Sequence, residues 1–200
     1  MRAVRVVRNG RPTESIVVED VPIPEPEPGG VRVAVSAASI NFGDIARCRG
    51  GVASVMASPP FTLGMDMCGV VDATGAGAER WMGRRVVGLA SQSLGGMADF
   101  ALSATVFDAP PQLDDVEAAA FTLPFHVGYL GLQERAQLQA GETLLVRGGA
   151  SAVGTAAIQL GVAAGATVIA VAGGAEKVRL CSELGAAVAI DHTSGLDLFD

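Results

Sequence analysis

The sequence has few aromatic residues and no cluster of basic residues, and each shortage narrows the class of protein. Aromatic residues make up 4% of the chain, so its apolar half comes mainly from Ala, Val, Leu and Ile. The net charge is −7 and Lys and Arg form no run. This balance argues against nucleic acids and anionic membranes as the main partners.

Cysteine is also scarce, with three residues far apart and no C-x-x-C pair: Cys48, Cys68 and Cys181. Their spacing excludes a zinc knuckle and suits a reducing compartment, so we expect a cytoplasmic protein in which they pack as small apolar residues. The first 12 residues are charged and lack the apolar segment of a signal peptide.

One nearly uncharged stretch, residues 152–174, is long enough to cross a bilayer. Gly161 and Gly165 interrupt it, and its composition changes from Ala-rich to Val- and Ile-rich. This pattern favours a buried helix followed by a buried strand of a parallel sheet, so we expect no membrane span.

Residues 142–177 predict a strand, a glycine turn, a helix and a second strand. Residues 143–147 are rich in β-formers between glycines, 151–164 are Ala-rich and end at Gly165, and 167–172 form a second β-rich run. That order is a βαβ unit, with parallel strands and a right-handed crossover.

The turn of this unit has the pattern G-x-S-x-x-G, which is a dinucleotide fingerprint with its middle glycine replaced by Ser151. Gly149 permits the tight turn and Gly154 permits close packing of helix on strand, while the helix start attracts a pyrophosphate. The hydroxyl of Ser151 can donate to a phosphate oxygen. An ordinary βα turn is the alternative interpretation. The candidate phosphate-binding residues are Gly149, Ser151, Ala152, Val153 and Gly154.

The end of the second strand, residues 172–174, lacks the acidic residue that NAD sites use to hold the ribose. Lys177 follows in the first turn of the next helix, where the helix dipole disfavours a cation. We therefore interpret Lys177 as a contact to the 2′-phosphate of NADP. A solvated lysine offset by Glu176 is the alternative, and Glu176 leaves room for NAD.

The first 110 residues predict a small all-β barrel or sandwich, because short β-rich runs alternate with Gly- and Pro-rich turns. The predicted strands are 3–7, 15–19, 31–36, 67–74, 85–89, 98–102 and 106–109. A short helix is expected at 41–49 and a loop at 50–60.

The character of the chain changes between residues 110 and 121. Asp114 and Glu117 have the spacing of a capping box that begins a helix, and a separate, longer helical segment is predicted at 125–139. After the βαβ unit, a helix is expected at 176–184 and a third strand at 187–190.

Seven segments together resemble the zinc-independent medium-chain dehydrogenase/reductases, in the NADPH:quinone oxidoreductase (zeta-crystallin-like) branch. They are spread over most of the chain: residues 39–44, 63–71, 95–100, 117–120, 149–160, 176–177 and 183–186. The resemblance implies an α/β plus all-β fold. A GroES-like catalytic domain, residues 1–115, would precede a Rossmann NADPH-binding domain, residues 116–200, with the cofactor in the cleft between them.

The resemblance also implies hydride transfer from NADPH to a quinone or an α,β-unsaturated carbonyl. Zinc-dependent relatives have Cys at the position of Asn41 and His-Glu at the positions of Met65 and Asp66, so we expect no metal. Without a Lewis acid, catalysis depends on proximity and placed hydrogen bonds. Asn41 and Asp44 match the family's N-x-x-D and would lie near the nicotinamide, although turn chemistry also explains this pair.

At the adenosine end, Gly174 replaces a phosphate-binding serine that is usual in the family and His192 replaces a usual tyrosine. The resemblance implies that this end is formed by Gly173, Gly174, Lys177 and His192.

Family members are considerably longer, and the Rossmann sheet predicted here has only three strands and an exposed edge. We therefore interpret the 200 residues as a truncated product or fragment of a longer enzyme. For the full-length enzyme we expect a homo-oligomer with a small-molecule quinone or enone substrate. Two other functions stay open: an NADPH-binding protein without turnover, either crystallin-like or truncated, and a zinc-type alcohol dehydrogenase relative.

Overall fold

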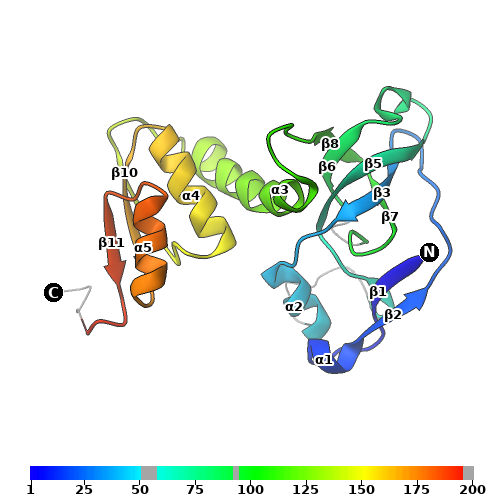
Figure 1. The fold of residues 1–200 in the computed structure, drawn as a ribbon, viewed down its shortest axis with the longest axis horizontal. Helices are drawn as coiled ribbons and strands as arrows, with labels where there is room; N and C mark the ends of the chain where they lie inside the picture. Colours follow the sequence, from blue (N-terminus) through cyan, green and yellow to red (C-terminus); the bar gives the residue numbers. More distant parts are fainter. Residues whose placement is uncertain (51–57, 92–94, 196–200) are drawn as a thin grey trace. The chain divides into compact units, whose positions relative to one another are not determined.

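The structure, a computed structural model, describes residues 1–50, 58–91 and 95–195. The chain divides into two compact units, Met1–Leu123 and Pro124–Asp200. Figure 1 shows the order of the elements along the chain. Each unit is built around its own apolar core.

The first unit consists of short antiparallel strands. Five of them form a sheet in the order β7-β3-β5-β6-β8, and three more form a second sheet in the order β2-β1-β4. Val33, Met67, Val71 and Val86 are buried in the core of the larger sheet. The strands are β1 (Arg2–Val6), β2 (Ile16–Asp20), β3 (Val31–Ala37), β4 (Phe61–Thr62), β5 (Asp66–Thr74), β6 (Arg85–Leu89), β7 (Phe100–Ser103) and β8 (Thr105–Asp108).

The predicted all-β region is therefore confirmed, with strand ends shifted by a residue or two. Strand β4 and the one-turn helix α1 (Pro12–Ser15) were not predicted, because each is too short to show a periodic pattern. The predicted short helix is α2 (Phe42–Arg49), which ends at Gly50 in the left-handed conformation. Of the loop predicted at 50–60, residues 51–57 lie outside the described residues.

One expectation about the helices was wrong. The two separate helical segments predicted from Asp114 onwards form a single helix α3 (Asp115–Tyr129), which continues through Pro124 and passes into a π-helical stretch, η4 (Leu130–Arg135). Proline removes one backbone hydrogen bond from a helix interior, but here it does not end the helix. The capping box at its start is confirmed, because Glu117 N donates to Asp114 Oδ1 at 2.8 Å and Asp114 N donates to Glu117 Oε2 at 3.1 Å.

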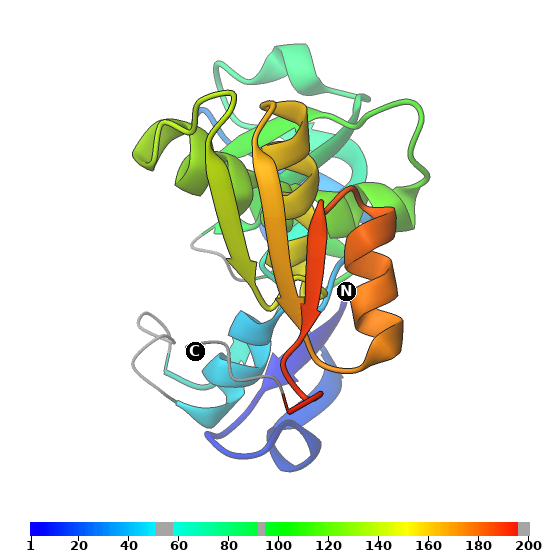
Figure 2. The same cartoon turned by 90° about the vertical axis from the view of Figure 1, so that its left-hand side faces the viewer.

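The second unit is a three-stranded parallel sheet in the order β11-β10-β9 (Figure 2). Helices α4 and α5 cover the same face of this sheet (Figures 1 and 2). The residues buried there include Val146, Ile158, Val168 and Cys181. The predicted βαβ unit is thus confirmed. The elements are β9 (Thr143–Arg147), α4 (Ala152–Ala163), β10 (Thr167–Ala172), α5 (Ala175–Glu183) and β11 (Val188–Asp191).

The uncharged stretch at 152–174 is divided between α4 and β10, as predicted. Among the helices that the structure describes, none combines the length and the apolar character needed to cross a bilayer.

Candidate functional site

The glycine turn between β9 and α4 ends in an N-cap made by Ser151. Its backbone is extended, and its hydroxyl oxygen accepts a hydrogen bond from Gly154 N at 3.1 Å. Because a hydroxyl accepts through its oxygen and keeps its own hydrogen, Ser151 can still donate to another group. Ser151, Ala152 and Val153 are exposed, so the first turn of α4 is accessible to a ligand.

The two glycines of the fingerprint occupy positions that exclude a side chain. A Cβ on Gly154 would overlap the carbonyl oxygen of Gly148 and lie 2.9 Å from Gly149 Cα. A Cβ on Gly149 would lie 2.7 Å from Cys181 Sγ. The turn therefore brings the backbone of β9 directly against the start of α4, which is the geometry that a pyrophosphate needs at a helix N-terminus.

The carboxyl end of β10 carries a second turn, Gly173–Gly174, and the structure brings an acidic residue to it. Parallel pairing places Asp191 of β11 opposite Ala172. Its Oδ1 accepts hydrogen bonds from Gly174 N at 2.9 Å and from Thr193 N and Oγ1 at 2.9 and 2.6 Å. The hydrogen bond from Gly174, followed by those from Thr193, lowers the pKa of Asp191 to about 2.

Residues 172–174 carry no acid, as the sequence indicates, but Asp191 of β11 accepts a hydrogen bond from the turn that they form. This carboxylate comes from the neighbouring strand and lies outside residues 172–174 of the sequence. A register prediction for the parallel pair 167–172 and 187–190 was the only signal that could have found it.

His192 and Lys177 lie on the segments that flank the same turn. The imidazole of His192 lies beside Gly173, since a Cβ on that glycine would come 2.9 Å from His192 Nε2. Lys177 is exposed in the first turn of α5, which begins directly after Gly174. The structure thus brings Gly173, Gly174 and His192 together, with Lys177 on the adjoining helix.

The first unit holds a buried polar cluster at the start of α2, where Asn41 is the N-cap residue. Asp44 accepts hydrogen bonds from Asn41 N at 2.8 Å and from Gly64 N at 3.3 Å. Asp44 is buried, and this burial raises its pKa, while the two backbone N–H groups and Arg47 act in the opposite direction. Asp44 therefore ties the turn before α2 to the segment before β5, which is the turn chemistry considered above.

A second carboxyl group, Asp66, lies beneath this turn with 0% of its surface exposed. Its Oδ1 accepts hydrogen bonds from Ser39 Oγ at 2.6 Å and from Asn41 Nδ2 at 3.2 Å, and Asn41 Nδ2 also donates to Ser39 Oγ at 2.8 Å. Its Oδ2 is buried, and no side chain donates a hydrogen bond to it. Burial raises the pKa of Asp66, as does the charge of Asp44, whereas Ser39, the backbone N–H of Leu123 and Asn41 lower it.

Sequence reasoning did not include Ser39 or Asp66 in the site. Asp66 begins a strand whose next residues, Met67 and Cys68, are fully buried, and an acid in such a run is the signal that could have found it.

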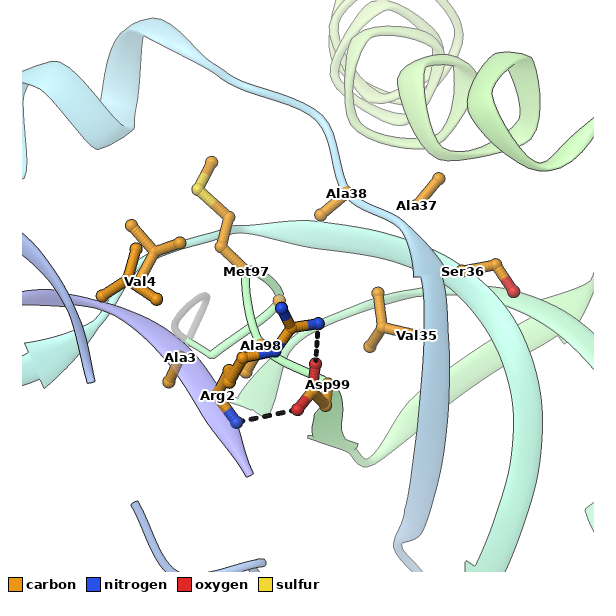
Figure 3. A pocket seen from close by; sticks show the side chains of 12 residues that line it. Arg2, Ala3, Val4, Val35, Ser36, Ala37, Ala38, Met97, Ala98 and Asp99 are labelled. Carbon is orange, nitrogen blue, oxygen red and sulfur yellow. Dashed lines mark hydrogen bonds and ion pairs between the residues drawn. The ribbon is translucent and has the colours of Figure 1, made fainter. Parts of the chain in front are cut away.

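A cavity of about 330 Å³ lies in the first unit, beside the segment that leads to Ser39 (Figure 3). Its walls are mainly apolar and include Val35, Ala38 and Met97. Arg2 and Asp99 form an ion pair at 3.5 Å within the lining, and Arg2 N donates to Asp99 Oδ2 at 2.7 Å. An apolar lining with one charged pair does not by itself define a ligand.

Among the residues that the structure describes, no group of three or more His, Cys, Asp or Glu side chains is placed to hold a metal ion. The absence of a metal remains a prediction from Asn41 and Met65, because amide and thioether groups are poor zinc ligands.

Two family models match the chain. The alcohol dehydrogenase GroES-like domain matches residues 27–106, and the zinc-binding dehydrogenase domain matches residues 152–199. The two units therefore have the predicted architecture, a GroES-like part followed by a Rossmann-like part.

Among curated proteins, the quinone oxidoreductase of Homo sapiens is 34% identical over 194 residues, which cover 96% of this chain and 59% of that protein. A probable oxidoreductase from Mycobacterium abscessus has a similar structure, with a TM-score of 0.87, 35% identity and coverage of 98% of this chain and 62% of that one. The quinone oxidoreductase of Thermus thermophilus, also solved in complex with NADPH, has a TM-score of 0.82 and 35% identity, and the match covers 96% of this chain and 60% of that one. The chain thus spans about three fifths of the length of the curated quinone oxidoreductases that it matches.

Proposed function

We propose a function from one premise: the chain belongs to the medium-chain dehydrogenase/reductase family, in its quinone oxidoreductase branch. The proposed function is hydride transfer from NADPH to a quinone or an α,β-unsaturated carbonyl, without zinc. The observation that carries it is the accessible first turn of α4, in which Gly154 admits no Cβ because it packs against the backbone of Gly148 and Gly149. The relative from Thermus thermophilus, which binds NADPH, supports it further.

NADPH would be held at two places in the second unit and, when bound, supplies the hydride. At the glycine turn, backbone N–H groups and the hydroxyl of Ser151 donate to the pyrophosphate. At the end of β10, Asp191 holds the turn at Gly174 through its hydrogen bond. The proposed cofactor contacts are Gly149, Ser151, Ala152, Val153 and Gly154 for the pyrophosphate, and Gly173, Gly174, Lys177 and His192 for the adenosine end.

In the first unit, we assign Asn41 to the catalytic site, where its Nδ2 donates to Ser39 Oγ at 2.8 Å and to Asp66 Oδ1 at 3.2 Å and so acts on the acceptor through Ser39. Asp44 is a positioning residue, because its carboxylate binds Asn41 N and Gly64 N. Hydrogen bonds placed in advance then do the work that a metal would do in zinc-dependent relatives.

We also propose that residues 1–115 form the catalytic domain and that residues 116–200 form the NADPH-binding domain. The substrate is a small molecule, and the whole enzyme is a cytoplasmic homo-oligomer. The three cysteines support a reducing compartment, since all are free and buried.

The test of cofactor preference uses Lys177, the only lysine in the chain. Lys177→Ala should weaken NADPH binding about tenfold, because a charge-assisted hydrogen bond contributes about 1.5 kcal/mol, and it should leave NADH binding unchanged. The matched control is Arg179→Ala, which removes another exposed cation from α5, one that pairs with Glu183 at 2.7 Å. Titration calorimetry with both nucleotides measures the effect, and equal loss of NADPH and NADH affinity contradicts the assignment.

Turnover is followed as oxidation of NADPH by quinones and enones in metal-free buffer. A rise in melting temperature with NADPH but no oxidation of it by any acceptor favours a binding protein without turnover. One zinc ion per chain in metal analysis, with activity that depends on it, favours a zinc-type alcohol dehydrogenase relative.

A further inference from the structure

The hydrogen bonds around Asp66 connect a fully buried carboxyl group to a half-buried hydroxyl. Ser39 Oγ lies 2.6 Å from Asp66 Oδ1, while Asp66 itself has no exposed surface. A hydroxyl group can accept one proton while it donates another. Ser39 can therefore pass a proton from the buried acid to a group at the turn before α2.

The surroundings of Asp66 favour its neutral form. A buried carboxylate is costly unless it is fully paired, and no side chain donates to the buried Oδ2 of Asp66. The charged side chain that acts on it is Asp44 of α2, whose negative charge opposes a second one nearby. Burial and this charge both raise the pKa of Asp66.

We propose that Asp66 and Ser39 form a proton relay that protonates the reduced acceptor, an inference that rests on the proposed function. The β-carbon of the acceptor receives the hydride with its electron pair, the π electrons of its C=C bond move to form a double bond with the carbonyl carbon, and the carbonyl π electrons move onto the acceptor oxygen. That oxygen takes the proton of Ser39 Oγ, and Ser39 takes the proton of Asp66. After the product leaves, water returns a proton to Asp66 through Ser39.

The arrangement in the structure fits the discharged state of this relay. Once Ser39 has taken the proton of Asp66, its O–H points back at Oδ1 along the 2.6 Å contact. Asn41 Nδ2 adds a second donor to the same oxygen at 3.2 Å. The negative charge that the step leaves on Asp66 therefore meets two donors already in place, and no group has to reorganise.

The relay predicts a specific dependence of turnover on pH. Asp66 must hold its proton, so kcat falls as the pH rises through the pKa of this group. Asp66→Asn keeps the shape of the side chain but has no acidic proton, so kcat should fall about 100-fold, as for loss of a general acid, and this ionisation should vanish from the profile. KM and the melting shift with NADPH should stay as in the wild type.

Ser39→Ala tests the second half of the relay. It should lower kcat to a similar degree while leaving Asp66 protonated, which infrared spectroscopy detects as the C=O stretch of a neutral carboxyl group. That band should be present in the wild type and in Ser39→Ala and absent from Asp66→Asn. The matched control is Ser103→Ala, because Ser103 is buried in the same unit and donates to Leu89 O at 2.7 Å.

The outcomes separate the relay from the proposed function. An active wild type whose pH profile is unchanged in a folded Asp66→Asn overturns the relay alone, and so does an infrared spectrum in which Asp66→Asn removes no band. If the wild type oxidises no NADPH with any acceptor, the proposed function fails and the relay fails with it. Should Asp66→Asn not fold, the pH profile and infrared band of Ser39→Ala still decide the question.

Discussion

Replacing Gly154 by alanine tests whether the close approach at the glycine turn is as tight as the structure indicates. The added Cβ would overlap the carbonyl oxygen of Gly148 and lie 2.9 Å from both Cα and C of Gly149. All of these are backbone atoms of the turn, so no side chain can rotate away to make room. The turn or the start of α4 must move instead.

Overpacking costs about 1–3 kcal/mol, and the value should be near 3 kcal/mol where backbone has to shift. For a unit of this size, each kcal/mol lowers the melting temperature by about 4–8 °C. Gly154→Ala should therefore melt more than about 10 °C below the wild type, and should show a smaller melting shift with NADPH.

The matched control is Gly131→Ala in η4, where a Cβ would meet nothing within 4 Å. That change should be neutral or stabilise the protein by about 0.4–1 kcal/mol, because alanine restricts the unfolded chain. Urea denaturation followed by circular dichroism measures both variants. If Gly154→Ala unfolds within about 0.5 kcal/mol of the wild type, the close approach argued for this turn does not exist.

Two further predictions concern titratable groups. The pKa of Asp191 is about 2 in the folded chain and about 3.9 in the unfolded chain, so this group stabilises the fold above pH 4 and loses that effect as the pH falls towards 2. The variant Asp191→Ala should therefore flatten this part of a curve of melting temperature against pH. An unchanged slope contradicts the role of the hydrogen bonds to Asp191. Burial, with the charge of Asp115, raises the pKa of Cys68 to about 11, and Cys48 and Cys181 are also free and buried. A thiol reagent at pH 8 should therefore label the native chain far more slowly than the urea-unfolded chain. Equal labelling rates would refute the burial of these thiols.

The parts of the fold that sequence predicted are those determined by local chemistry. The strands at 85–89 and 167–172 coincide with β6 and β10, because their β-rich runs end at glycine or polar turns. The capping box of Asp114 and Glu117 was found because its two partners are only three residues apart. Helix α3 was predicted wrongly because Pro124 breaks isolated helices, whereas this one continues through it.

The candidate site was predictable only where its residues follow one another in the chain. Gly149 to Gly154 form one turn, so the fingerprint was visible directly. Asp66 lies 27 residues from Ser39, and Asp191 lies 17 residues from Gly174, so only the folded sheets bring these pairs together. Long-range pairs of this kind depend on strand register, which composition and spacing do not determine.

The two buried carboxyl groups of the first unit differ in a way that assigns them different roles. Asp44 has a backbone N–H donor at each oxygen and the charge of Arg47 nearby, whereas both side chains that donate to Asp66 meet the same oxygen, Oδ1. Because two nearby carboxylates repel each other, the group whose charge is offset by Arg47 ionises first, and its charge raises the pKa of the other. Asp44 is thus suited to hold the turn of Asn41 as an anion. Asp66 keeps the proton, and Ser39 is the only hydroxyl bonded to it in the described part of the chain.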